Sequence, residues 1–332
     1  MSAYDAPIAA AGFGISVGHA TDAAGATGCT VVRATEGALR ASAFASGRAT
    51  ATREWALLEP WASNDRIDAV LLTGGSAYGL DAAAGVMRWM EERGRGYPIA
   101  GGVVPIVPAA VVFDLAPLGN FSARPTPEMA YAACERAAPT GWDEGSVGAG
   151  TGCTVGKLYG PRHAMKGGIG VGYAGVAVER SAGNADRVVP SACAIAVVNA
   201  VGHVRGPGGE IIAGPREPGG GIADSEATGY VRGFFAPPEA NTTIAVVALN
   251  RAYSKVELHR IARAASAAYA RRIGPSGTQY DGDVVFAVCP LDAPGGDTMR
   301  AELVATAALE DAIVRAVRAA KGRDGIPGLA DA

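Results

Sequence analysis

The sequence predicts a mixed α/β fold, because short buried strands and capped helices both occur along the chain without strict βαβ alternation. Aliphatic runs bounded by turn residues predict strands over 68–73, 193–198, 244–249 and 284–288. Apolar residues at helical spacing predict helices over about 80–93, 127–137, 254–273 and 297–321. The chain shows no fixed-period repeat, and we treat residues 1–332 as a single domain.

Local capping signals define several of these helix boundaries. Ser254 and Glu257 form the capping-box pattern, in which each residue satisfies a backbone N–H near the start of a helix. Gly274 followed by Pro275 predicts the end of that helix, with Gly274 as its C′ residue. Pro127 and Glu128 suit the first turn of another helix.

Glycine-rich stretches predict loops between packed layers. We expect loops over 74–79, 145–156 and 167–172, and a long loop over 205–240. Gly156-Lys157 resembles the end of a phosphate-binding P-loop, but that motif requires Gly at position 151 and Ser or Thr at position 158. The chain has Thr151 and Leu158, so the sequence does not predict nucleotide binding.

The composition describes a compact protein with no sign of nucleic-acid or membrane partners. Hydrophobic residues make up 49% of the 332 residues, and the formal net charge is −3. No basic run predicts nucleic-acid binding, no apolar stretch reaches the roughly 18 residues of a membrane span, and the N-terminus lacks a signal-peptide pattern. Five scattered cysteines without a CxxC pair favour a reducing compartment. We therefore expect a cytoplasmic protein.

A candidate nucleophile lies where a buried strand begins. Asn241-Thr242-Thr243 directly precedes the apolar run 244–249, and Pro237-Pro238 before it is typical of a loop. If the peptide bond before Thr242 breaks, the new α-amino group becomes a base beside the threonine hydroxyl. Cleavage after Asn241 would give fragments 1–241 and 242–332.

Other polar residues at strand ends and turns supply groups that an amide hydrolase requires. Taken singly, Lys157 is typical of a surface charge, Asn199 of a turn, and Asp281 and Asp283 of a hairpin. Together with Thr242 they offer a nucleophile, an oxyanion donor, a cation and orienting carboxylates. The chain has neither a GxSxG nor an HExxH motif, so we expect no serine-hydrolase elbow, no metal and no cofactor.

Several segments in order make the chain resemble the self-cleaving L-aminopeptidase/D-esterase (DmpA-type) hydrolases, also called P-one family peptidases. The resemblance is strongest with the branch that contains nylon-oligomer hydrolase, and it spans roughly residues 12 to 320. The matching segments are 17–21, 73–80, 104–108, 147–157, 165–168, 197–199, 241–244 and 281–283.

The resemblance implies an αββα sandwich like that of DmpA and ornithine acetyltransferase. It also implies autocatalytic cleavage between Asn241 and Thr242, association of the resulting α and β chains, and homo-oligomers such as a tetramer of αβ units. Carried over by motif, Thr242 is the nucleophile, Tyr78 and Asn199 hold the oxyanion, and Lys157 lies beside the threonine.

Asp281 and Asp283 would orient and activate the threonine. In the aminopeptidase branch, Ser occupies the positions of Thr242 and Asp281, so this chain favours the nylon-oligomer branch. The leading hypothesis is an amidohydrolase acting on 6-aminohexanoate oligomers or similar small linear amides. An aminopeptidase that releases N-terminal residues is the alternative. Acyl transfer to an amine and a non-catalytic scaffold are weaker readings, since the Ala-Thr-Met-Leu-like motif of ornithine acetyltransferase is absent while the catalytic positions are filled.

Overall fold

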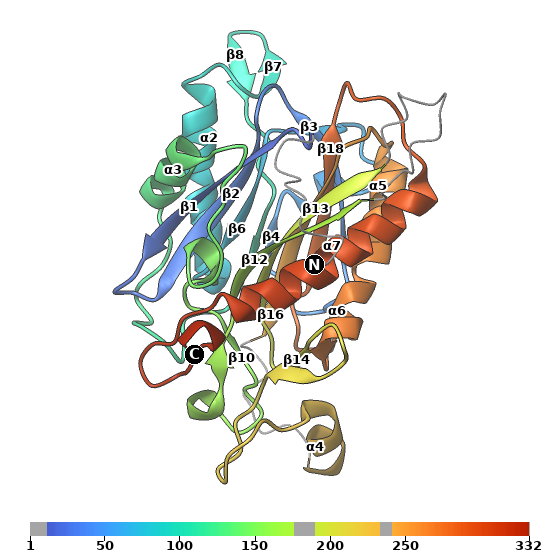
Figure 1. The fold of residues 1–332 in the computed structure, drawn as a ribbon. Coiled ribbons are helices and arrows are strands. Elements are labelled where there is room, and N and C mark those ends of the chain that lie inside the picture. Colours follow the sequence, from blue (N-terminus) through green and yellow to red (C-terminus); the bar gives the residue numbers. More distant parts are fainter. Residues whose placement is uncertain (1–11, 176–189, 233–240, 332) are drawn as a thin grey trace.

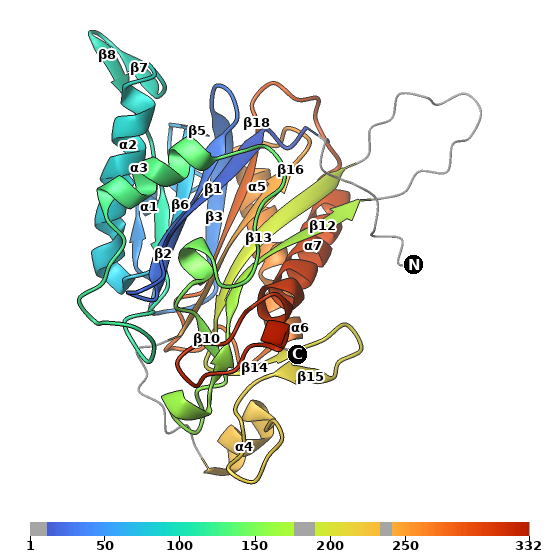
Figure 2. The same ribbon diagram turned by 60° about the vertical axis from the view of Figure 1, so that its left-hand side comes forward.

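Two β-sheets pack face to face, and helices cover the outer face of each sheet (Figures 1 and 2). The structure, a computed structural model, describes residues 12–175, 190–232 and 241–331. The helix–sheet–sheet–helix order confirms the predicted αββα sandwich.

The first sheet has the order β1-β2-β6-β9-β4. Its strands are β1 (Ile15–Asp22), β2 (Thr27–Ala34), β6 (Ala69–Thr73), β9 (Ala109–Val111) and β4 (Thr52–Arg53). Helices α2 (Ala83–Glu91) and α3 (Pro127–Arg136) lie on its outer face. Short α1 (Trp55–Leu58) follows β4.

The second sheet has the order β12-β13-β16-β18-β3-β5. Its strands are β12 (Gly168–Gly175), β13 (Ser191–Asn199), β16 (Thr242–Leu249), β18 (Val284–Pro290), β3 (Leu39–Ala45) and β5 (Arg66–Ile67). Helices α5 (Lys255–Ala265), α6 (Ala267–Arg272) and α7 (Thr298–Arg318) cover it. β16 and β18 run parallel, whereas β13 runs antiparallel to β16.

Smaller elements lie at the ends of the sandwich. They are the β7–β8 hairpin (Tyr97–Ile99 and Gly102–Val104), β10 and β11 (Thr154–Val155 and Met165–Lys166), β14, β15 and β17 (His203–Arg205, Ile211–Ala213 and Ile273–Gly274), α4 (Ser225–Arg232), and the 3₁₀ turns η2 (Ser76–Ala82), η3 (Gly148–Gly150), η4 (Pro161–His163) and η5 (Leu329–Asp331).

Strand β16 shows why its sequence is apolar without alternation. Ile244 and Val246 point into the core between the sheets, whereas Ala245 and Val247 point into the core beneath the helices. A strand that is buried on both faces has no solvent side, so polar residues do not alternate with apolar ones. The same double burial applies to β18 next to it, where all residues from Val284 to Cys289 are buried.

The local helix signals are confirmed where the structure describes them. Ser254 and Glu257 form both hydrogen bonds of the capping box at the start of α5. Pro127 occupies the first turn of α3, which ends at Arg136. Asp297 caps α7 through a hydrogen bond from the Arg300 backbone. These signals succeeded because each depends on residues only a few positions apart.

The predicted glycine loop over 167–172 is wrong, because Gly168–Gly175 form strand β12. A Cβ atom on Gly170 would lie 2.2 Å from the Ala312 carbonyl oxygen, and one on Gly172 would lie 2.1 Å from that of Ala308. Both carbonyls belong to α7. Glycine here therefore permits close packing of a helix on a strand, which is a non-local reason for its presence.

Other boundaries also differ from the sequence prediction. The segment after β6 turns at once into the 3₁₀ helix η2, so helical structure begins at Ser76 and not near residue 80. The predicted loop over 205–240 contains β15 and α4, and its residues 233–240 lie outside the described part. The predicted helix over 254–273 is divided at Ser266 into α5 and α6, whereas Gly274 follows the Ile273 C-cap of α6 as predicted and also pairs with β14.

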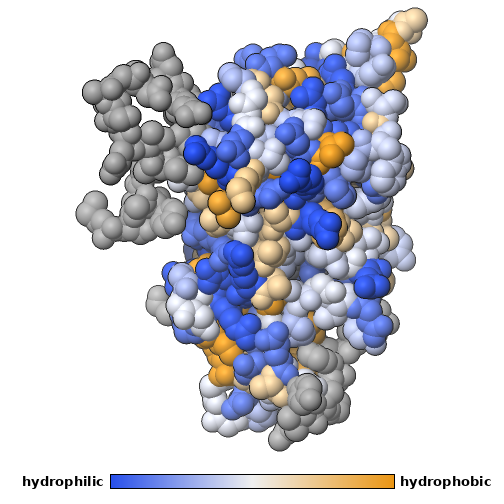
Figure 3. All heavy atoms as spheres, turned by 90° about the vertical axis from the view of Figure 1, so that its right-hand side faces the viewer, coloured by the Kyte–Doolittle hydropathy of each residue, from blue (hydrophilic) through white to orange (hydrophobic). Residues whose placement is uncertain are grey.

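The face over the right-hand side of Figure 1 carries polar residues interspersed with small apolar areas (Figure 3). Within the described ranges, no helix combines the length and apolar character required to span a bilayer. All five cysteines are buried as free thiols.

Candidate active site

The predicted site residues converge because the ends of three neighbouring strands, β13, β16 and β18, lie side by side in the second sheet. Asn199 ends β13 and lies opposite Thr242, the first residue of antiparallel β16. Asn241 pairs with Asp281, just before β18, which runs parallel to β16. Parallel strands that begin side by side place their preceding loops side by side as well, so the 241–242 junction lies next to the 281–283 turn.

The junction between Asn241 and Thr242 is buried, and its carbonyl has two donors. The Thr242 Oγ–H donates to the Asn241 carbonyl oxygen at 2.5 Å. The Gly282 backbone N–H donates to the same oxygen at 3.2 Å. A Cβ atom on Gly282 would lie 2.8 Å from Thr242 Oγ, so glycine lets the turn approach the hydroxyl.

Lys157 reaches this junction from the loop after β10. Its Nζ lies 3.0 Å from both the backbone and side-chain oxygens of Asn199, and 3.5 Å from Asn241 Oδ1. The lysine is buried, and burial lowers the pKa of its amine to about 7, although the nearby Asp281 charge acts in the opposite direction. A substantial fraction of Lys157 is therefore neutral near pH 7.

The Asn199 side chain is fixed by several partners. Its Oδ1 accepts from the Thr154 backbone N–H at 3.0 Å as well as from Lys157. Its Nδ2 donates to the Phe113 carbonyl oxygen at 2.9 Å. Phe113 follows β9 in the first sheet, so this hydrogen bond joins the two sheets at the site.

Two buried carboxylates hold the turn beside the junction. Asp283 accepts from the Thr243 backbone N–H at 2.7 Å and from the Gly277 N–H at 3.0 Å. Asp281 accepts from the Thr278 N–H at 2.8 Å. Burial raises the pKa of Asp283, and the charge of Asp281 raises it further. Asp283 thus ties the second residue of β16 to the loop that precedes β18.

Tyr78 is placed differently from the other predicted residues. It lies in η2 and is 56% exposed, with the Arg124 guanidinium 3.5 Å from its ring centroid. Among the described residues, its phenol shares no hydrogen bond with the group around Thr242. The structure therefore brings together Thr242, Asn241, Lys157, Asn199, Asp281 and Asp283, and leaves Tyr78 at the surface.

Sequence reasoning missed several groups of this site. Gly282 supplies the second donor to the Asn241 carbonyl, and its Asp-Gly-Asp setting was a signal that could have identified it. Phe113 contributes only a backbone carbonyl, and such a contact cannot be predicted from the type of residue because every residue has this group. Lys166, nine positions after Lys157, is a second buried lysine. Its Nζ donates to the Thr151 and Cys153 carbonyls at 2.9 and 2.7 Å, and burial lowers the pKa of its amine to about 8.

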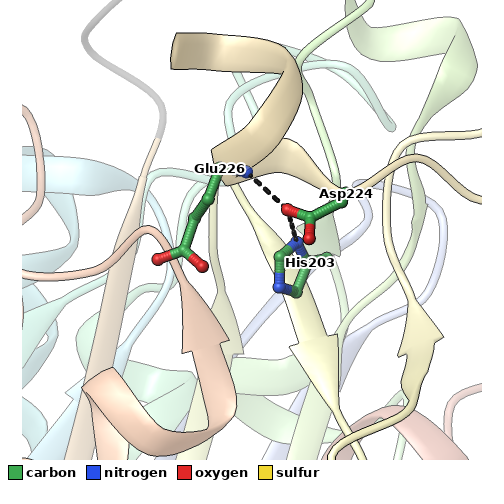
Figure 4. Close-up of side chains that lie close together, drawn as sticks. All are labelled: His203, Asp224 and Glu226. Carbon is green, nitrogen blue, oxygen red and sulfur yellow. Dashed lines mark hydrogen bonds and ion pairs between the residues drawn. The ribbon is translucent and has the colours of Figure 1, made fainter.

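A second cluster of titratable groups lies at the start of α4 (Figure 4). Ligand atoms of His203, Asp224 and Glu226 all lie within 4.8 Å of one another. However, the Ser225 backbone N–H donates to His203 Nδ1 at 3.0 Å, and Arg205 lies 2.7 Å from a Glu226 oxygen. Asp224 also accepts from the Glu226 N–H at 2.9 Å. The cluster is therefore explained as the cap of a helix, with Arg205 already supplying a cation.

Solved structures share this fold. The L-aminopeptidase D-Ala-esterase/amidase from Ochrobactrum anthropi, described as a variant of the Ntn hydrolase fold, matches with a TM-score of 0.68 and 19% identity over 94% of this chain and 86% of that chain. The chain therefore has the fold of this Ntn-type hydrolase structure.

The family is shown by sequence. The model of Peptidase family S58 matches residues 13–330, so the chain belongs to this family of hydrolases that act on peptide and amide bonds. An uncharacterized aminopeptidase of Mycobacterium leprae (strain TN) is 38% identical over 95% of this chain and 91% of that relative. A 6-aminohexanoate-oligomer endohydrolase of Kocuria sp. (strain KY2) is 32% identical over 89% of this chain and 79% of that relative.

Proposed function

We propose that the protein is a self-cleaving amidohydrolase whose nucleophile is the N-terminal threonine released by scission between Asn241 and Thr242. The observation that carries this proposal is the geometry of the junction. The Thr242 hydroxyl lies 2.5 Å from the Asn241 carbonyl oxygen, and the Gly282 N–H donates to the same oxygen. A nucleophile and a donor for the developing oxyanion thus share one peptide group.

In self-cleavage, Thr242 Oγ attacks the Asn241 carbonyl carbon and its proton passes to neutral Lys157. The negative charge that forms on the carbonyl oxygen is stabilised by the Gly282 N–H. The C–N bond then breaks, the Thr242 nitrogen takes the proton from Lys157, and an ester joins Asn241 to Thr242 Oγ. Water hydrolyses the ester, which leaves a carboxylate on Asn241 and a free amine and hydroxyl on Thr242.

In turnover, the α-amino group of Thr242 acts as the general base for its own hydroxyl. Its unperturbed pKa is about 7.7–8.0, which suits proton transfer near neutral pH. Thr242 Oγ attacks the substrate amide, with Asn199 and, as the resemblance to DmpA-type hydrolases implies, Tyr78 as donors to the oxyanion. The amine leaves with the transferred proton, and water releases the acyl group from the enzyme. Asp281 and Asp283 orient the 281–283 turn around the threonine.

The two fragments would remain associated because the cut lies inside the second sheet. β16 and β18 come from fragment 242–332, whereas β13 and β3 on either side of them come from fragment 1–241. Separating the fragments would break two strand pairings and expose apolar cores on both faces of the sheet. We also propose a homo-oligomer, as the resemblance to DmpA-type hydrolases implies.

Two substrate classes follow from the relatives. The Thr242 and Asp281 pattern favours 6-aminohexanoate oligomers or similar small linear amides, and a relative with that activity in its name is 32% identical. Aminopeptidase activity is the second candidate, because the mycobacterial relative with 38% identity is named an aminopeptidase. Exclusive release of N-terminal residues would favour the aminopeptidase, and internal cuts in the oligomers would favour the amidohydrolase.

The test compares wild type with Thr242→Ala and Thr242→Ser on a panel of aminoacyl p-nitroanilides, β-peptides and 6-aminohexanoate oligomers. We expect Thr242→Ala to remain a single chain and to lose at least about 10³-fold in turnover, because the nucleophile is gone. Thr242→Ser keeps a hydroxyl and should still cleave itself. Turnover of any panel substrate by Thr242→Ala at the wild-type rate would overturn the proposal.

A further inference from the structure

The segment Val112–Asp114 joins the two parts of the site that the strands do not bring together. The Val112 carbonyl accepts from the Ser76 N–H at 3.0 Å, in the turn that carries Tyr78. The next carbonyl, that of Phe113, accepts from the Asn199 amide at 2.9 Å. Consecutive carbonyls of one short segment thus hold the Tyr78 turn on one side and Asn199 on the other.

The carboxylate of Asp114 adds a third tie from the same segment. It is buried, and its Oδ1 accepts from the Gly75 N–H at 2.6 Å. Its Oδ2 accepts from the Thr27 hydroxyl at 2.7 Å, and Thr27 is the first residue of β2. Asp114 therefore anchors the start of the Tyr78 turn to the first sheet.

The turn that Asp114 holds has an unfavourable backbone conformation. Gly75 has φ of +80° and Ser76 has φ of +52°, and the left-handed region is uncommon for a residue with a Cβ such as serine. Such conformations persist where surrounding contacts fix them, and they cluster at functional sites. The hydrogen bond from Gly75 to Asp114 and that from Ser76 to Val112 are contacts of this kind.

The turn and the carboxylate are packed so closely that there is no room for a side chain at Gly74. A Cβ atom on Gly74 would lie 2.1 Å from Asp114 Oδ2 and 2.4 Å from Thr27 Oγ. Burial raises the pKa of Asp114 to about 6, although the hydrogen bonds from Gly75 and Thr27 counteract part of this effect. Near pH 7 the carboxylate is mostly ionised and accepts from both donors.

We propose that Asp114 is a positioning residue that fixes the Tyr78 turn relative to the Asn199 amide, so that both side chains are available to one oxyanion. The inference rests on the proposed function, in which Tyr78 and Asn199 are the donors. Asp114 itself does not touch the junction; it acts through the backbone of Gly75 and Ser76 and through its neighbour Phe113.

Asp68 provides a matched control at the opposite end of β6. It is fully buried, accepts from the Ile106 backbone N–H at 2.8 Å, and its pKa is also raised by burial. Asp68 and Asp114 are thus both buried carboxylates that tie a backbone N–H next to β6. They differ in that Asp114 holds the end of the strand that leads to Tyr78.

The test compares Asp114→Ala with Asp68→Ala, measuring kcat and KM per cleaved active site on the best panel substrate. We expect Asp114→Ala to lower kcat about 10²-fold, as misplacement of reacting groups by about 1 Å does, with KM changed less than about three-fold. Asp68→Ala should keep kcat within about three-fold, although both variants lower Tm. Asp114→Asn can still accept from Gly75 and donate to Thr27, so it should restore most of kcat.

Equal kcat for both alanine variants, or a change in KM alone, would overturn the inference. If Asp114→Ala does not fold, Thr27→Val removes one anchor of the carboxylate and should lower kcat about ten-fold, whereas Thr27→Ser keeps the hydroxyl and kcat. An unchanged kcat in Thr27→Val would then contradict the proposal. A normal loss of activity in Thr242→Ala together with an unaffected Asp114→Ala would refute this inference and leave the proposed function intact.

Discussion

Lys157 and Lys166 lie nine positions apart, and both are buried with amines that point at carbonyl oxygens. Burial lowers the pKa of both, to about 7 for Lys157 and about 8 for Lys166. Their partners differ. Lys166 donates to the Thr151 and Cys153 carbonyls, whereas Lys157 contacts the Asn199 amide and the Asn241 side chain at the proposed cut.

Burial and a lowered pKa do not by themselves distinguish a reactive lysine from a structural one. Both lysines have these properties, and both would be selected by a search for perturbed groups. What differs is the contact with side chains of the reacting junction. We therefore propose the chemical role for Lys157 and a structural role, closing the glycine-rich loop, for Lys166.

The largest expected difference is between Lys157→Met and Lys166→Met in the rate of self-cleavage. Lys157→Met should slow self-cleavage by about 10²–10⁴-fold, the usual contribution of a proton-transfer group. Lys166→Met should leave self-cleavage within about three-fold and lower Tm, because two buried carbonyls lose their donor. Time-resolved denaturing electrophoresis measures cleavage, and thermal unfolding measures Tm. If Lys166→Met, while folded, stops cleavage as completely as Lys157→Met, the distinction between the two lysines is wrong.

A second comparison uses asparagines at the two ends of the β13–β16 pair. Asn199 is the partner of Lys157, whereas Asn250 accepts from the Ser191 backbone N–H at 2.8 Å at the far end. Asn199→Ala should lower kcat by about 10²–10³-fold, as loss of one oxyanion donor does. Asn250→Ala should leave kcat within about three-fold. Steady-state kinetics on the cleaved proteins would contradict this account if both variants lost activity equally.

The smallest expected effect is the pH dependence of self-cleavage. Because the pKa of Lys157 is lowered to about 7, the neutral amine increases about ten-fold from pH 5 to pH 6 and then levels off above pH 7. The initial rate of cleavage should follow this curve, and Lys166→Met should follow it too. The free energy of unfolding should also rise with pH between about pH 7 and 10.5. In that range Lys157 binds a proton in the unfolded chain but has lost it in the folded one. A cleavage rate that falls from pH 6 to pH 8 would exclude neutral Lys157 as the proton acceptor.

Much of the fold could be predicted from the sequence because its signals are local. The capping box at Ser254 and the apolar run of β16 are each contained in a few residues. Strand β12 could not be predicted, since its glycines are required by close packing against α7, which lies far away in the sequence. A glycine-rich stretch has the same composition whether it turns in solvent or packs beneath a helix.

The residues of the site and its surroundings also fall into those that the sequence indicates and those that it does not. Thr242, Asn199 and Asp283 are polar residues next to the ends of apolar strands, so the sequence indicates them as candidates when they are taken together. Asp114 lies outside the segments that match the family, and Lys166 lies in one of them without an assigned role. The burial of both residues becomes visible only when the layers are packed. The carbonyl of Phe113 gives no signal in sequence at all.

Cleavage between Asn241 and Thr242 is tested by the intact mass and N-terminal sequence of freshly purified, fully active protein. We expect two species that correspond to residues 1–241 and 242–332, with Thr242 as the first residue of the shorter one. An active preparation that contains only the unbroken 332-residue chain would contradict this expectation.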